Sequence, residues 1–190
     1  MNVFENDISH CINVLQSGGL ILYPTDTIWG IGCDATNEEA VGKIFDLKKR
    51  PEEKSMIILV SDEKDILQYV PSPDRRLFDY LGKTTKPTTV IYSSVAGIAA
   101  NAINKDGSVA IRICRDEFCK QLIKRFGKPI ISTSANISGQ ASPALFATIS
   151  EEIKNGVDYV VKYKQSDDKI NSPSSIIKWN NDGTVEVLRS

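Results

Sequence analysis

The chain has 190 residues, of which 41% are hydrophobic and 25% are charged, and its formal net charge is −1 at pH 7. This length suits one domain over residues 1–190, which can bury its own core without disulfide or metal cross-links. The near-neutral charge gives no sign of a chain-wide nucleic-acid or membrane surface, so any anion site would have to be local.

Cysteine and histidine are too scattered to predict a metal centre. His10 is the only histidine, and no two cysteines form a CxxC pair. The first ten residues lack a basic start typical of signal peptides, and no apolar run approaches the ~20 residues of a membrane span. We therefore expect a soluble cytoplasmic protein with reduced thiols in or near its core. The four cysteines are Cys11, Cys33, Cys114 and Cys119.

Helical and extended patterns alternate along the first half of the chain. Asn6 and Asp7 are candidate caps of a helix that ends at Gly18, and further helices are expected after Asn37 and Asp62. Short apolar runs predict buried strands between these helices. The runs are Leu20–Tyr23 and Met56–Val60.

The second half continues the alternation, and the whole pattern indicates an α/β fold with a twisted, mixed central sheet flanked by helices. Helices are expected at Asp116–Phe126, ending at Gly127, and at Ala144–Ile153. Strands are expected at Thr88–Tyr92, Val109–Ile113, Pro129–Ser132, Tyr159–Val161, Ser175–Trp179 and Val185–Leu188.

Three loops follow buried elements and hold polar residues that packing alone would not select, where ligand sites of α/β sheets tend to lie. The first loop covers residues 24–32 and begins Pro-Thr-Asp-Thr. Its hydroxyls suit a small polar substrate, but an ordinary turn in which Asp26 and Thr27 bond their own backbone also explains it. Taken alone, this loop favours the turn.

The second loop, residues 48–54, holds four cations within seven residues. Arg50 could bind two phosphate oxygens at once, with Lys48 as a point charge. Alternatively, these cations complement the dipole at the end of a helix. The two readings are evenly balanced.

The third loop, residues 132–139, reads Ser-Thr-Ser-Ala-Asn-Ile-Ser-Gly directly after an apolar run. Such a dense set of hydroxyls, an amide and backbone N–H groups suits a phosphate better than a simple helix cap. The chain has neither a GK[ST] phosphate loop nor a GxSxG elbow. This inventory of cations, hydroxyls and amides suits anion binding and alignment of reactants more than proton transfer.

Taken together, these segments resemble the YrdC-like family of threonylcarbamoyl-AMP synthases, in its short single-domain form. The matching segments run in family order over nearly the whole chain: GGLILYPTDTIWGIGCDA, IFDLKKRPEEK, VAIRIC, GKPIISTSANISG, SPSSIIKW and EVLRS. The resemblance implies a YrdC-like fold and an ATP-dependent nucleotidyltransferase. Its substrates would be L-threonine, bicarbonate or carbon dioxide, and ATP, and its product would be passed by a partner enzyme to tRNA.

The resemblance also implies residue roles. The catalytic set would be Lys48, Arg50, Ser134 and Asn136, which would bind ATP together with Ser108, Ser142 and Arg189. The threonine set would be Thr25, Arg112, Ser132 and Ser174. Because Val109, Ile111 and Ile113 alternate along one strand, Arg112 should face away from these apolar residues. Magnesium would arrive with ATP, and no protein ligand for it can be named.

Several positions depart from the family pattern, mostly on the threonine side. Trp29 stands where tyrosine is usual and Leu59 where many members have histidine. The tetrapeptide TTKP at residues 84–87 replaces Trp-Pro-Gly-Pro, and Ser175 and Lys178 replace a threonine and an acid.

Three alternatives stay open. One is a double-stranded-RNA-binding module, with cations of residues 48–50 and 124–125 as its patch. The second is the carbamoyl-adenylate chemistry of a hydrogenase-maturation protein, although nothing here supplies that protein's zinc-finger cysteines. The third is a nucleotide-binding module without turnover, which release of pyrophosphate would exclude.

Overall fold

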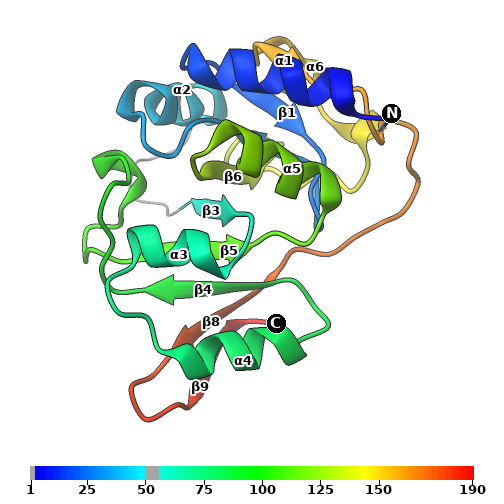
Figure 1. Cartoon of the computed structure of the whole chain (residues 1–190). Coiled ribbons are helices and arrows are strands. Elements are labelled where there is room, and N and C mark those ends of the chain that lie inside the picture. Colours follow the sequence, from blue (N-terminus) through cyan, green and yellow to red (C-terminus); the bar gives the residue numbers. More distant parts are fainter. Residues whose placement is uncertain (1–2, 50–55) are drawn as a thin grey trace.

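The computed structural model describes residues 3–49 and 56–190. Within these residues, one sheet of nine strands runs in the order β7-β1-β2-β6-β3-β5-β4-β8-β9 (Figure 1). The strands are β1 (Ile21–Tyr23), β2 (Gly30–Gly32), β3 (Ile57–Val60), β4 (Thr88–Tyr92), β5 (Val109–Ile113), β6 (Ile130–Ser134), β7 (Tyr159–Val160), β8 (Ser175–Trp179) and β9 (Val185–Arg189).

The sheet is mixed, as the sequence predicts. β1 and β7, β3 and β5, and β4 and β8 pair in parallel, while the remaining neighbours are antiparallel. The α/β class with a mixed central sheet is therefore confirmed.

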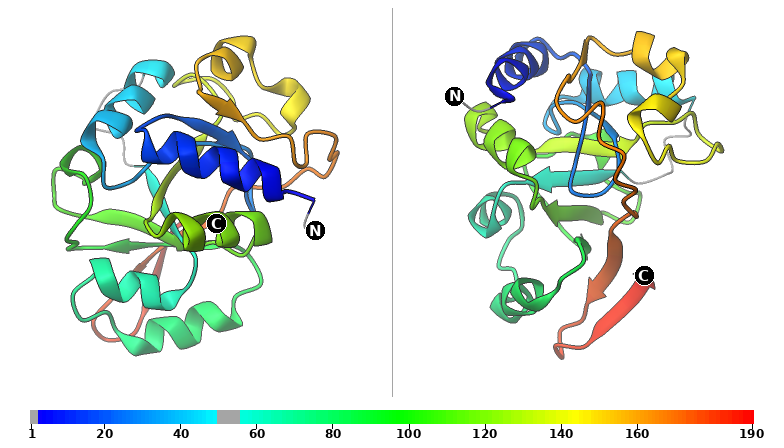
Figure 2. Two further views of the ribbon diagram at one scale, coloured as in Figure 1. Left: turned by 45° about the horizontal axis from the view of Figure 1, so that its top comes forward. Right: turned by 90° about the vertical axis from the view of Figure 1, so that its right-hand side faces the viewer.

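Helices cover the two faces of the sheet unequally (Figure 2, right). The helices α1, α3, α4 and α5 line one face, whereas α2, α6 and a short 3₁₀ turn lie over part of the other. Their bounds are α1 (Glu5–Gln16), α2 (Glu38–Lys48), α3 (Glu63–Tyr69), α4 (Arg75–Lys83), α5 (Glu117–Phe126) and α6 (Glu151–Asn155).

Capping residues set several helix ends where the sequence places them. Asn37 accepts a hydrogen bond from the backbone N–H of Ala40 at the start of α2, and Asp116 caps α5 in the same way. Asp62 caps α3. Gly127 ends α5 with a φ of 77°, a left-handed conformation that glycine adopts without strain.

The predicted cap of α1 is wrong. The helix begins at Glu5, without a side-chain cap, so Asp7 lies inside its first turn. Its buried carboxylate instead accepts hydrogen bonds from the Tyr159 hydroxyl and from the N–H groups of Lys162 and Tyr163. Asp7 therefore bonds to residues far along the chain and does not cap its own helix. These bonds fix the segment after β7.

The helix predicted at residues 144–153 is also wrong. A 3₁₀ turn, Phe146–Thr148, comes first, and α6 begins only after Ser150. Ser150 is extended, with a ψ of 149°, and its hydroxyl accepts a hydrogen bond from the N–H of Ile153. Because serine favours this cap over a helix interior, it divides the segment.

Two further elements were not expected from the sequence, namely β2 and α4. β2 consists of Gly30-Ile31-Gly32 and begins where the first loop was predicted to continue. A Cβ atom on Gly32 would lie 2.6 Å from the Tyr23 ring and 2.7 Å from the Ile131 carbonyl oxygen. Glycine is thus required for β1, β2 and β6 to approach one another here.

The core lies between the sheet and the helices. Its strands contribute alternating residues, so Ile58, Val90 and Ile111 pair side by side at almost zero exposure. All four thiols are buried, as expected. Among the described residues, no helix is long and apolar enough to cross a bilayer.

Candidate functional site

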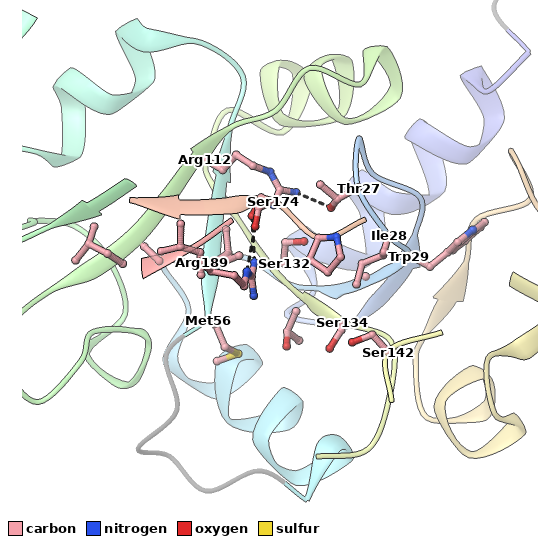
Figure 3. A pocket seen from close by; sticks show the side chains of 17 residues that line it. Thr27, Ile28, Trp29, Met56, Arg112, Ser132, Ser134, Ser142, Ser174 and Arg189 are labelled. Carbon is pink, nitrogen blue, oxygen red and sulfur yellow. Dashed lines mark hydrogen bonds between the residues drawn. The ribbon is translucent and has the colours of Figure 1, made fainter. Parts of the chain in front are cut away.

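A cavity of about 300 Å³ opens on the sheet face opposite α3, α4 and α5 (Figure 3). Alternation along the strands supplies its floor, because β5 presents Ala110 and Arg112 here while Val109 and Ile111 face the core. The predicted orientation of Arg112 is thus confirmed. The cavity brings together six sequence-predicted site residues: Arg112, Ser132, Ser134, Ser142, Ser174 and Arg189.

Arg112 is the most deeply buried cation of the cavity, with 3% of its surface exposed. Its Nη2 atom lies 3.1 Å from Asp26 Oδ1 and 3.3 Å from the Thr27 hydroxyl, to which it donates a hydrogen bond (Figure 3). Its Nε has no hydrogen-bond partner among the described residues. A buried donor without a partner is uncommon in native proteins, and its position on the cavity wall suits an anionic ligand.

Arg189 brings a second guanidinium to the cavity from β9. Its Nε donates to the Ser174 carbonyl at 3.0 Å and its Nη2 to the Ser174 hydroxyl at 3.3 Å. That hydroxyl also lies 2.8 Å from the Thr89 hydroxyl on β4. Partial burial, and secondarily the charge of Arg112, lower the pKa of Arg189. Two guanidiniums near enough to influence each other line the cavity, and no carboxylate is among its described lining residues, so the cavity favours an anion.

Hydroxyls from β6 and the loop after it form another side of the cavity. Ser132 is buried, Ser134 is half-buried, and Ser142 is exposed. Ser132 and Ser134 share a face because they stand two residues apart on β6. The strand extends two residues further than predicted, so these two hydroxyls are held by the sheet and not by a loop.

Lys48 lies at the end of α2 and is only 1% exposed. Its Nζ donates to the backbone carbonyls of Ser134 and Asn136, and its own carbonyl accepts the N–H of Ser138 at 2.8 Å. The lysine therefore braces the turn after β6, and neither it nor Asn136 is part of the cavity lining.

Asn136 is oriented by its own loop. Its Nδ2 donates to the carbonyls of Ile137 and Gln140 at 3.0 and 2.8 Å, which leaves Oδ1 buried without a partner among the described residues. Arg50, predicted beside it, lies outside the described residues.

Two further sequence-predicted residues, Thr25 and Ser108, also lie outside the cavity lining. The Thr25 hydroxyl donates to the Ile28 carbonyl at 2.8 Å and accepts the Thr27 N–H at 3.0 Å, so it shapes the first loop. Ser108 precedes β5, at the opposite end of that strand from Arg112, and its hydroxyl donates to Asp106 at 2.6 Å.

The cavity also contains groups that the candidate residue set omits. Thr27, Met56 and Pro173 line it, and Asp26 reaches Arg112 from behind. The interpretation in which Asp26 and Thr27 bond their own backbone is wrong for Asp26, whose partners lie beyond residue 110. It is wrong for the Thr27 hydroxyl too, which contacts the hydroxyl of Thr25 and the guanidinium of Arg112. Asp26 stands between two hydroxyl residues directly after a strand, which is the one signal in the sequence that marks it.

Metal ligands do not gather in this part of the chain. Within residues 3–49 and 56–190, no cluster of three or more His, Cys, Asp or Glu side chains could hold a metal ion. The chemistry available from the described residues is charge, hydroxyl groups and backbone donors.

The sequence and the fold both resemble known proteins. A family model for Sua5, YciO and YrdC proteins, described as "Telomere recombination", matches residues 13–190. Threonylcarbamoyl-AMP synthase from Idiomarina loihiensis is 33% identical over 147 residues, covering 75% of this chain and 78% of that protein. The enzyme of the same name from Hahella chejuensis is 31% identical over 170 residues, covering 89% and 91%.

Among solved structures, P. abyssi Sua5 complexed with L-threonine superposes with a TM-score of 0.86 at 23% identity. The match covers all of the present chain but only 55% of P. abyssi Sua5. The similarity therefore concerns the fold of one part of P. abyssi Sua5. The family model alone covers most of the present chain, and the fold matches that of P. abyssi Sua5. The chain belongs to the Sua5/YciO/YrdC family.

Proposed function

We propose that this protein is an L-threonylcarbamoyladenylate synthase. The reaction joins L-threonine, bicarbonate or carbon dioxide, and ATP into threonylcarbamoyl-AMP and releases pyrophosphate. The observation that supports it best is Arg112, a buried guanidinium whose Nε lacks a partner among the described residues, at the wall of a hydroxyl-lined cavity. Two relatives above 30% identity are named threonylcarbamoyl-AMP synthase.

The threonine half of the site would be the sheet floor. Arg112 would bind the α-carboxylate, since a guanidinium matches the two oxygens of a carboxylate. Ser132 and the hydroxyl of Ser174 would accept or donate hydrogen bonds to the amine and side-chain hydroxyl. Thr25 would act by shaping the loop that positions Thr27, which lines the cavity.

The reaction needs little proton transfer from the protein at its adenylation step. The threonine nitrogen first forms a bond to the carbon of carbon dioxide and loses a proton, which gives a carbamate. A carbamate oxygen then attacks the α-phosphorus of ATP, and the bond to the leaving pyrophosphate breaks. Alignment and neutralisation of phosphate charge therefore dominate, in keeping with a site rich in cations and hydroxyls.

The nucleotide would occupy the side formed by β6 and α2. Ser134 and Ser142 would contact the phosphates, with Asn136, Ser108 and Arg50 as further candidates. Lys48 would act on the phosphates through its charge and by holding the carbonyls of Ser134 and Asn136. Arg189 would lie between the two halves, because it binds Ser174 and its pKa responds to Arg112.

Magnesium would enter bound to ATP. Hydroxyls are the main uncharged polar side chains of the cavity, and the described residues offer no cluster of three or more His, Cys, Asp or Glu side chains that could hold a metal ion. This donor set suits an ion that keeps its waters and the substrate's phosphate oxygens as ligands.

We further propose that the product serves threonylcarbamoylation of an adenosine in tRNA. A separate transferase would take up the product, and the reaction would take place in the cytoplasm. Direct RNA binding and nucleotide binding without turnover are the competing functions.

The test is release of pyrophosphate from ATP with magnesium and bicarbonate present. We expect release that requires threonine and fails when glycine replaces it. ATP binding without any threonine-dependent release would contradict the synthase and favour a nucleotide-binding module. Binding of duplex RNA that weakens steeply with salt, again without release, would favour the RNA-binding function.

A further inference from the structure

Asp26 is a buried carboxylate that the reaction itself does not use. Its side chain is 7% exposed, and Oδ1 lies 3.1 Å from Arg112 Nη2. Oδ2 accepts the backbone N–H of Arg115 at 3.0 Å. One carboxylate therefore connects the first loop both to the functional arginine and to the segment that leaves β5.

The support behind this carboxylate is itself anchored. The Arg115 guanidinium donates to the carbonyls of Leu81 and Thr85, each at 3.1 Å, and to the Thr84 hydroxyl at 2.8 Å. These contacts attach the end of β5 to the end of α4. Asp26 consequently accepts from a backbone group that has little freedom to move.

The polar contacts of Arg112 with the described residues are confined to one nitrogen of its guanidinium, Nη2. Asp26 and Thr27 both meet Nη2, whereas Nε is without a hydrogen-bond partner among the described residues. The contact with Asp26 is an ion pair without a well-aligned hydrogen bond, since Oδ1 has no hydrogen-bond partner. This arrangement fixes where the guanidinium lies and leaves Nε without a partner in the described part of the chain.

We propose that Asp26 is a positioning residue for substrate binding: it holds Arg112 in the orientation that receives the threonine α-carboxylate. The inference rests on the proposed function, because it takes threonine as the ligand. It assigns Asp26 a role beyond balancing charge in a cavity with two arginines.

Positioning and charge balance predict opposite results when the negative charge is removed. If Asp26 only offset the charge of Arg112, Asp26→Asn would make the cavity more positive and would tighten binding of any carboxylate. If Asp26 positions Arg112, the same change weakens binding, because Nη2 loses its ionic partner and Arg189 repels the released guanidinium. Asparagine keeps the size of the side chain and an oxygen for the Arg115 N–H.

The experiment measures the affinity of purified wild type and Asp26→Asn for L-threonine and for L-threoninamide by calorimetry. Threoninamide retains the amine and the hydroxyl but lacks the carboxylate. We expect Asp26→Asn to weaken threonine binding about 10- to 100-fold, the usual range for a hydrogen bond to a charged group. Threoninamide binding should change much less, and the KM for ATP should stay close to that of wild type.

Asp34→Asn is the matched control. Its side chain is 5% exposed and pairs with Lys128 at 2.7 Å, and it accepts two hydrogen bonds from Thr36. It therefore resembles Asp26 in burial and pairing, but its side-chain partners, Lys128 and Thr36, lie outside the cavity lining, whereas Asp26 contacts Arg112. We expect a loss of stability in this variant and no change in threonine affinity.

Thr27→Val is a second variant that keeps every charge and removes the hydrogen bonds of the Thr27 hydroxyl to Arg112 Nη2 and to the Thr25 hydroxyl. We expect a loss of threonine affinity of about threefold, in the direction of Asp26→Asn, and less for threoninamide. It keeps the proposal testable if Asp26→Asn fails to fold.

The outcomes separate this inference from the function on which it rests. Wild-type protein that binds threonine and releases pyrophosphate, beside an Asp26→Asn variant with unchanged or tighter threonine binding, would overturn the positioning role alone. Equal losses for threonine and threoninamide would overturn it as well, since they would indicate a general defect. Wild-type protein that neither binds threonine nor releases pyrophosphate would overturn the proposed function, and this inference with it.

Discussion

The two faces of the sheet differ although the same strands build both. On β5, Ile111 points to the face covered by α3 and α5, where it is 1% exposed between Ile58 and Val90. Arg112, the next residue, points to the opposite face, where the cavity lies. One face contributes stability through apolar burial, and the other places charged and hydroxyl groups that a ligand can reach. Adjacent residues can therefore serve separate purposes, and substitutions one position apart should have separable effects.

Arg112→Gln should have the largest effect of these substitutions, and the effect should be on the activity of the cavity face. Removing one member of a buried charge pair typically costs about 2–5 kcal/mol, so kcat/KM for threonine should fall about a hundredfold or more. The core face of β5 is untouched, but Asp26 loses its buried ionic partner, so the midpoint of thermal unfolding should also fall. Steady-state pyrophosphate release and a melting curve measure the two quantities. Full activity in this variant would remove Arg112 from the site.

Lys48→Met should lower stability and activity together, because Lys48 is buried and also braces the turn after β6. Two carbonyls lose their donor, so we expect a loss of stability of about 2–3 kcal/mol together with a sharp fall in turnover. A lysine that only binds ATP could instead be replaced with a loss of turnover and no loss of stability. Denaturant unfolding, followed beside the turnover assay, distinguishes the two.

Ile111→Val should weaken the core face and leave the cavity face intact. Removal of one buried methylene group costs about 1 kcal/mol, which lowers stability without altering the orientation of Arg112. Urea unfolding should show the loss, while KM for threonine and for ATP stay at their wild-type values. A changed threonine KM would mean that the two faces are coupled.

Asp74→Asn should have the smallest effect, because it lies far along the sheet from both regions. Hydrogen bonds from Arg76, and then from Trp179, lower the pKa of Asp74 below its ordinary value of 3.8. A lowered folded-state pKa contributes stability that is present above the unfolded pKa and is lost as pH falls through the folded pKa.

As pH falls from neutral to acidic, the free energy of unfolding should therefore decrease slightly less in Asp74→Asn than in wild type. Because this carboxylate is exposed to solvent, the difference should be small and should decrease further at high salt. An unchanged pH profile at low salt would show that the contacts between α4 and the β8–β9 hairpin contribute nothing measurable.

Much of the fold could be predicted from local patterns. Apolar runs marked the central strands, and Asn37, Asp116 and Gly127 marked helix ends, because their hydrogen bonds or φ values involve only neighbouring residues. β2 gave no such signal: it has three residues, two of them glycine, and it forms only because β1 and β6 flank it.

The site was predicted unevenly for the same reason. The orientation of Arg112 followed from the alternation of β5, and the hydroxyls of β6 followed from their density in the sequence. Asp26 and Lys48 could not be assigned their contacts, since their partners lie 86 to 89 residues away along the chain. Local sequence patterns show which functional groups are present, whereas tertiary contacts determine the partners of each group.

The most direct test of the proposed synthase activity is to identify the reaction product. The enzyme would be incubated with ATP, magnesium, threonine and isotope-labelled bicarbonate, and the nucleotides would be examined at once by mass spectrometry. The proposal predicts an adenylate that carries both threonine and the labelled carbon, and its absence in Arg112→Gln. Unlabelled adenylates alone, or unchanged ATP, would contradict it.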